Sequence, residues 1–319
     1  MPDATPRLRQ DRRGDKVRRT FDRVASAFAE SDFLYREMAR RMDERLELVR
    51  IAPSRILDAG CGLGSDRSHL TRRYPEALWL GLDQSLGMLR YGAQADNPSG
   101  RPAMGFLQRL LRSMTPVKKP TNALRVVGAL DALPLAGQQI DFIWSNAALH
   151  WLNDLPLALK EFNRVLKVGG LLMFSTFGPD TLKELRGALL AAAGHGQQAA
   201  RIYDFIDMHD VGDMLVHAGF SDPVMDMETL TLTYADPWQA LRELQQAGSM
   251  APYPPIAGLT PRAFWERVFE HWLPNREGRY PLTFELVQGH AWKVAPRQHD
   301  DGRAIVNFMP RPGQPQQRD

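Results

Sequence analysis

Short apolar runs alternate with helix-like amphipathic stretches from residue 54 onward. Each run is rich in branched or aromatic residues and has the length of a single strand. The predicted strands are RILDAG (55–60), LWLGLD (78–83), LRVVGA (124–129), IDFIWSN (140–146) and LLMFSTF (171–177). The stretches at 67–75, 85–93 and 155–166 are predicted helices. This alternation is typical of an α/β fold, in which crossover helices cover both faces of a parallel sheet.

Three longer stretches interrupt this core. The first, 94–123, is a predicted cap, and the other two, 178–207 and 237–279, are predicted helical lids. The lid at 178–207 begins with a predicted helix that has Pro179 near its first turn. Two β-like segments, 226–234 and 282–294, have the period of antiparallel strands added at the sheet edge. We therefore expect one α/β domain with a mostly parallel seven-stranded sheet and helical lid insertions.

The composition fits a single globular domain with a tail at each end. The chain has 319 residues, 44% of them apolar, and its longest apolar runs fall far short of the roughly 20 residues that span a bilayer. The Arg-rich N-terminus carries three aspartates and no apolar stretch, so neither a secretory signal nor a transit peptide is predicted. We expect unstructured tails at 1–17 and 296–319, a domain at 18–295, and a cytoplasmic monomer. The single cysteine, Cys61, excludes disulfides and cysteine-based metal sites, and no metal site is predicted.

The sequence LDAGCGLG, residues 57–64, carries the first chemical signal. Glycines at 60, 62 and 64 follow a predicted strand, and such a turn lets backbone amides and a helix N-terminus approach a ligand. Nicotinamide cofactors use a related turn, so the glycines alone leave the ligand open. Asp58 at the strand end would repel a pyrophosphate and suits a ligand with an ammonium or sulfonium group. S-adenosylmethionine carries both groups.

Five motifs in order resemble those of class I S-adenosylmethionine-dependent methyltransferases, which have a Rossmann-like sheet. They are LDAGCGLG, GLDQS, DALPL, FIWSNAALHW and RVLKVGGLLMFS, within residues 54–177. The resemblance implies a set of cofactor contacts. Asp58, Gly60, Gly62 and Gly64 would surround the methionine part, Asp83 with Gln84 the ribose, Asp131 with Ala132 the adenine, and Asn146 would lie near the sulfonium.

The flanking segments resemble a narrower family, the malonyl-acyl-carrier-protein O-methyltransferases of biotin synthesis. RRTFDRVASAFAESDFLYREM, FSTFGPDTLKELR and YPLTFELVQGHAWK carry this resemblance over most of residues 18–294. It implies methyl transfer to the free carboxylate of a malonyl group on an acyl carrier protein. Two alternatives stay open: a class I methyltransferase for another small acceptor, and a cofactor-binding assembly factor like the arginine hydroxylase of mitochondrial complex I. Nucleic acid is disfavoured because SNAALHW replaces the Asn/Asp-Pro-Pro-aromatic motif of amino-methylating DNA enzymes.

Candidate acceptor-binding residues are less well marked. His150 and Trp151 follow the fourth strand closely, and Tyr35 and Tyr280 are weaker candidates of the same kind; core packing is the alternative for each. A cation should orient the acceptor carboxylate, and the candidates on the predicted lids are Arg186, Arg201, Arg276 and Arg279. The basic cap, with Arg109, Arg112, Lys118 and Lys119, is a candidate surface for an acidic carrier protein. The alternatives are a plain solvated insertion and binding to an anionic membrane surface through its amphipathic helix.

Overall fold

A seven-stranded sheet organises the computed structural model of the chain, which describes residues 5–96, 122–193, 204–248 and 261–295, with side chains from Gly14 onward. The strand order is β3-β2-β1-β4-β5-β7-β6. The strands are β1 (Arg55–Ala59), β2 (Leu78–Asp83), β3 (Ala123–Val127), β4 (Ile140–Ser145), β5 (Leu166–Phe177), β6 (Phe220–Tyr234) and β7 (Tyr280–Lys293). The first five are parallel, and β7 is antiparallel to both β5 and β6. The predicted mostly parallel sheet with an antiparallel edge is therefore confirmed.

Helices cover both faces of the parallel part. The covering helices are α2 (Phe33–Leu46), α3 (Arg67–Arg73), α4 (Leu86–Asp96), α6 (Leu155–Val165) and α8 (Met208–His217). Successive strand residues point to opposite faces, so Leu57 and Ile143 pack in a cluster with α6 and α8, whereas Ile56, Phe142 and Trp144 pack with α2 and α3. None of the helices that the structure describes is long and apolar enough to cross a membrane.

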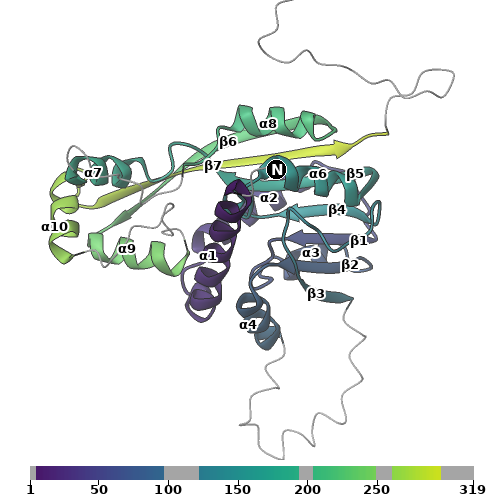
Figure 1. Ribbon diagram of the computed structural model, residues 1–319, viewed down its shortest axis with the longest axis horizontal. Helices are drawn as coiled ribbons and strands as arrows, with labels where there is room; N and C mark the ends of the chain where they lie inside the picture. Colours follow the sequence, from purple (N-terminus) through teal and green to yellow (C-terminus); the bar gives the residue numbers. More distant parts are fainter. Residues whose placement is uncertain (1–4, 97–121, 194–203, 249–260, 296–319) are drawn as a thin grey trace, which may run out of the picture.

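The strands β6 and β7 run well beyond the parallel core and form a ribbon (Figure 1). Three helices pack on this ribbon: α7 (Lys183–Ala193), α9 (Pro237–Gln246) and α10 (Arg262–His271). Their shared core includes Trp272, Phe284 and Leu286, each at most 3% exposed. The helical lid insertions expected from the sequence are thus a second packed layer on the extended antiparallel ribbon.

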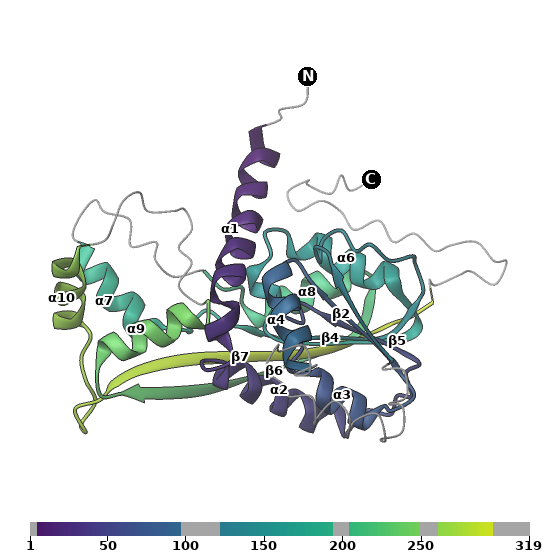
Figure 2. The same ribbon diagram turned by 90° about the horizontal axis from the view of Figure 1, so that it is seen from below.

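Helix α1 (Thr5–Phe28) lies across the junction between the parallel core and this ribbon, and its N-terminal half projects away from the body (Figures 1 and 2). Val17 is 1% exposed and Gly14 lines the pocket described below. The expected unstructured tail over residues 1–17 is therefore wrong at its C-terminal end. The second expected tail, 296–319, and most of the cap, 97–121, lie outside the described residues.

Two predicted boundaries are also wrong. β6 begins at Phe220 instead of residue 226, because Asp222 at φ +48° and Pro223 form an irregularity inside the strand that looks like a turn in sequence. Helix α7 begins at Lys183 and not near Pro179. The segment before it is held against β7, where the Gly178 nitrogen donates to the Glu285 carbonyl oxygen at 2.9 Å.

Candidate functional site

The glycine turn after β1 has the backbone conformation that the sequence predicted. Gly60, Gly62 and Gly64 have φ values of +79°, +51° and +78°, where a side chain would be strained. A Cβ at Gly60 would also lie 2.4 Å from the Ala148 Cβ. The Gly60 nitrogen donates to the Leu82 carbonyl oxygen at 2.8 Å, so the turn is tied to the end of β2. The turn therefore presents bare backbone at the carboxyl edge of the sheet.

Asp83, the last residue of β2, holds the glycine turn from the other side. Its Oδ2 accepts a hydrogen bond from the Gly62 nitrogen at 2.9 Å, and its Oδ1 accepts one from the Ser85 nitrogen at 2.7 Å. Burial raises the pKa of the Asp83 carboxyl, and these backbone donors oppose that shift. The side chain thus lies where a ribose would meet it, beside the turn.

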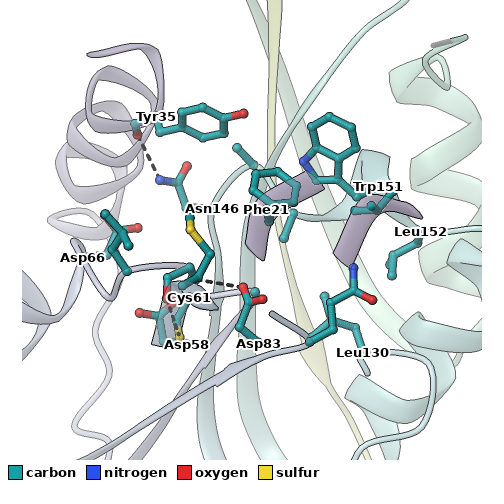
Figure 3. A pocket seen from close by; sticks show the side chains of 18 of the residues that line it. Phe21, Tyr35, Asp58, Cys61, Asp66, Asp83, Leu130, Asn146, Trp151 and Leu152 are labelled. Carbon is teal, nitrogen blue, oxygen red and sulfur yellow. Dashed lines mark hydrogen bonds between the residues drawn. The ribbon is translucent and has the colours of Figure 1, made fainter. Parts of the chain in front are cut away.

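Two further buried carboxylates, Asp58 and Asp66, lie on the same side of the pocket (Figure 3). Asp58 is 2% exposed and its Oδ2 accepts from the Trp79 Nε1 at 3.2 Å; Asp66 is 9% exposed and its Oδ2 accepts from the Trp144 Nε1 at 2.8 Å. Burial raises the pKa of both carboxyls, and the charge of Asp66 raises that of Asp58 further. A cationic group of a ligand would offset the cost of burying the two charged carboxylates and would reduce the repulsion between them.

Most of the predicted cofactor residues line one pocket, together with Tyr35 and Trp151. The predicted residues that line it are Tyr35, Asp58, Gly60, Gly62, Asp83, Gln84, Asp131, Asn146 and Trp151. Gly64 and Ala132 are not among the lining residues. At Gly64 a Cβ would come within 2.6 Å of the Arg125 guanidinium, so this glycine serves the packing of the turn. The Asp66 carboxylate is a lining residue that the sequence analysis missed.

The N-terminal helices supply a wall that the sequence analysis also missed. Val17, Phe21 and Phe28 of α1 line the pocket, and the Phe21 ring meets the Trp151 ring edge-on at 5.2 Å between centroids. The Phe28 ring lies 5.0 Å from the Tyr35 ring. The spacing of these apolar residues predicts an amphipathic helix, but it does not reveal which surface the helix covers. Aromatic rings therefore close the side of the pocket opposite the carboxylates.

Asn146 connects strand β5 to helix α2 and, through Tyr35, to the end of α9. Its Nδ2 donates to the Tyr35 carbonyl oxygen at 2.9 Å, and its Oδ1 accepts from the Ser175 Oγ at 2.7 Å. The Tyr35 hydroxyl in turn donates to the carbonyl oxygen of Ala247 at 2.7 Å, just after α9. The following residue, Ala147, has φ +50°, a conformation that is costly for a residue with a side chain and is common at functional sites. Asn146 thus lies in the pocket wall and fixes the position of α2.

Several candidate acceptor residues lie away from the pocket. The Arg279 Nε donates to the Thr233 Oγ1 at 2.9 Å, and the Tyr280 ring packs against Trp272 at 5.7 Å between centroids. Neither side chain lines the pocket. The His150 ring lies behind the wall, 4.7 Å from the Phe177 ring, with Trp151 and Phe205 on its other sides.

The predicted carboxylate-binding arginines that the structure describes do not line the pocket either. The Arg186 Nη1 pairs with the Asp204 Oδ1 at 3.0 Å, Arg276 is not a lining residue, and Arg201 lies outside the described residues. Among the described residues, the arginine that does line the pocket is Arg36, whose Nε pairs with the Asp32 Oδ1 at 3.0 Å. Arg36 was missed because nothing in its sequence context distinguishes it from the other arginines of α2.

The pocket fits S-adenosylmethionine in shape and in charge. The bare backbone of the glycine turn allows the ligand to approach closely. The buried carboxylates favour the ammonium and sulfonium groups of the ligand, and the aromatic wall also favours a cationic group. A pyrophosphate in this position would face Asp58 and Asp66, both of which disfavour an anion.

Comparisons with known proteins agree with this geometry. Residues 57–174 match the methyltransferase domain family. A malonyl-acyl-carrier protein O-methyltransferase of Gallionella capsiferriformans is 42% identical over 91% of this chain and 94% of its own length. The protein of the same name in Laribacter hongkongensis is 44% identical over 92% of this chain and 95% of its own length.

Solved structures support the fold alone. The YcgJ protein of Bacillus subtilis has a TM-score of 0.54 at 15% identity and covers 80% of this chain and 99% of its own. A methyltransferase from the Haloferax volcanii Trm112 complex has a TM-score of 0.51 at 17% identity, covering 89% of this chain and 100% of its own. With the sequence relatives above, the Rossmann-like methyltransferase fold is established, and the chain belongs to the malonyl-acyl-carrier protein O-methyltransferase family.

Proposed function

We propose that the protein transfers a methyl group from S-adenosylmethionine to the free carboxylate of a malonyl group carried on an acyl carrier protein. The observation that carries this proposal is the convergence of three carboxylates, the buried Asp58 and Asp66 and the half-buried Asp83, on a bare glycine turn in one pocket. The relatives named above act, by their names, on malonyl-acyl-carrier protein. In the biotin route such a reaction would convert the free carboxylate of the malonyl group into a methyl ester.

The donor supplies an electrophilic methyl group on a positively charged sulfur. Within the pocket, we assign Asp83 and Gln84 to the ribose and Asp131 to the adenine. Asp58 and Asp66 lie where the methionine ammonium would balance their charge. Arg36 is the lining cation available to the methionine carboxylate. These assignments are supported by the order of the residues along the pocket and by the signs of their charges.

The acceptor needs no general base. A malonyl carboxyl has a pKa of about 4, the range of an aspartate side chain, so it is already an anion at neutral pH. What the protein must supply is alignment and exclusion of water. Correct alignment of two reacting groups is worth on the order of 7 to 11 kcal/mol in favourable cases. The rings of Phe21, Phe28, Tyr35 and Trp151 form the dry wall that strips water from the carboxylate.

Mass spectrometry of the acceptor tests this proposal. The purified chain, S-adenosylmethionine and malonyl-acyl carrier protein should yield the carrier with one added methyl group, and fragmentation of the acyl-pantetheine arm should place that group on the malonyl carboxylate. Acetyl-acyl carrier protein, which lacks the free carboxylate, is the matched control and should stay unmodified. Methyl transfer to some other small acceptor, with malonyl thioesters untouched, would support the other class I reading. Tight S-adenosylhomocysteine binding without any transfer would support the assembly-factor reading.

A further inference from the structure

Helix α1 has two chemically different faces. One face carries Val17, Phe21 and Phe28 and forms a wall of the pocket. The helical period of 3.6 residues places Lys16, Arg19 and Arg23 together on the other side of the helix, away from that wall. Arg19 and Arg23 are exposed, and Lys16 is half-buried. The helix that covers the site thus presents a row of cations to solvent.

Helix α4 extends this basic row into a broader surface. The Asp22 Oδ1 accepts from the Ser85 Oγ at 2.7 Å and from the Gly87 nitrogen at 2.8 Å, which fixes α1 against the start of α4. A Cβ at Gly87 would lie 2.9 Å from the Asp22 Cα, so the glycine permits this close crossing. α4 therefore lies directly beside the outer face of α1.

The exposed side chains of α4 add both charge and apolar area. Leu86 is 41% exposed and Tyr91 is 37% exposed, and Arg90 between them is also exposed. We name the α1–α4 face as the surface formed by Lys16, Arg19, Arg23, Leu86, Arg90 and Tyr91. Large apolar side chains beside arginines are typical of the side chains that anchor protein interfaces.

The charge of the α1–α4 face is not balanced within the described part of the chain. No ion pair among the described residues involves Lys16, Arg19, Arg23 or Arg90. Of the nearby acids, Asp15 pairs with Arg18 at 3.0 Å, whereas Asp22 accepts hydrogen bonds from uncharged groups at the start of α4 and keeps its negative charge. The four cations outnumber this carboxylate, so the face keeps a net positive charge that attracts an acidic partner.

We infer, resting on the proposed function, that the α1–α4 face is the surface on which the acidic acyl carrier protein docks to deliver its malonyl group. Charge complementarity favours an acidic protein, and Leu86 with Tyr91 supply an apolar centre for it. A membrane surface fits less well, because the apolar face of α1 is turned inward to the pocket and Leu86 and Tyr91 alone give little area to insert.

Charge reversal on this face tests the inference. The variant Arg19→Glu/Arg23→Glu should raise KM for malonyl-acyl carrier protein at low salt by about tenfold or more, the lower end of electrostatic steering effects. Its kcat/KM for malonyl-pantetheine, which has the same thioester but no protein, should be unchanged. High salt should bring the wild type to the level of the variant, because screening removes the same attraction.

The matched control is Arg50→Glu/Arg72→Glu, which changes the net charge equally at exposed sites away from α1 and α4. This control should keep the wild-type KM for both substrates. Equal KM values for the two double variants on the carrier substrate would overturn the inference, as would equal losses on carrier and pantetheine substrates. Retained carrier binding with lost binding to anionic vesicles would overturn it in favour of a membrane role.

The proposed function fails separately from this inference. If the wild type methylates neither malonyl-pantetheine nor malonyl-acyl carrier protein, the chemistry is wrong. In that event docking is read directly from fluorescence anisotropy of labelled carrier protein with the S-adenosylhomocysteine-loaded enzyme. Loss of that binding in Arg19→Glu/Arg23→Glu, and not in the control, supports the inference; absence of binding to the wild type refutes it.

Discussion

Removal of the Asp83 carboxylate should weaken both cofactor binding and the fold, and the two effects can be measured separately. In Asp83→Ala, the nitrogens of Gly62 and Ser85 lose their acceptors, which lie at 2.9 and 2.7 Å. Leaving a buried donor unpaired costs about 1 to 3 kcal/mol. Removing a buried carboxylate whose pKa is raised by burial offsets part of this cost. We therefore expect a folded protein with reduced stability.

The effect on the cofactor is expected from the loss of its contact with the carboxylate. Hydrogen bonds from ribose hydroxyls to a charged acceptor are worth about 1 to 3 kcal/mol, which corresponds to a weakening of Kd by about 5-fold to about 150-fold. Isothermal titration with S-adenosylhomocysteine measures this change, and thermal unfolding without ligand measures the cost to the fold. Asp213→Ala, an exposed aspartate on α8, is the control and should bind normally. A wild-type Kd in folded Asp83→Ala would refute the ribose assignment.

Two other perturbations follow from the same pocket. Gly60→Ala should lose about 1 to 3 kcal/mol of stability and most cofactor affinity, because its Cβ would meet Ala148 at 2.4 Å. The control Gly187→Ala on α7, whose Cβ would have nothing within 4 Å, should be neutral or stabilising. Equal denaturation midpoints for the two variants would contradict this. Burial raises the pKa of Asp58 in the folded state above its unfolded value, so the unliganded protein loses stability as pH rises from the ordinary aspartate pKa through the raised one. The melting temperature of Asp58→Asn should therefore rise relative to that of the parent protein as pH increases over that interval. A difference between the two melting temperatures that does not change with pH would count against a raised pKa of Asp58.

The sequence was most informative where local chemistry and strand order coincide. Asp58 is the last but one residue of β1 and Asp83 is the last residue of β2. Parallel strands end at one edge of the sheet, so both side chains were expected in one crevice. The glycine conformations also follow from sequence, because few other residues tolerate positive φ at close spacing. Pattern and residue type were sufficient for this part of the site.

The parts that were missed depend on contacts between distant segments. Phe21 and Phe28 look like ordinary core residues of an amphipathic helix, and only the packing of α1 over Trp151 makes them a pocket wall. Arg279 looked suitable as a substrate cation, yet its guanidinium is bound to Thr233 on the neighbouring strand β6. Asp66 lies beyond the glycine motif, and its role depends on the Trp144 indole that holds it. Such contacts are fixed by tertiary structure and leave no local signal.

The most direct test of the account is the mass of malonyl-acyl carrier protein after incubation with the purified chain and S-adenosylmethionine. The account predicts the addition of one methyl group on the malonyl carboxylate, with S-adenosylhomocysteine formed in equal amount and acetyl-acyl carrier protein left unchanged. An unmodified malonyl carrier, in the presence of a chain shown to bind S-adenosylhomocysteine, would contradict it.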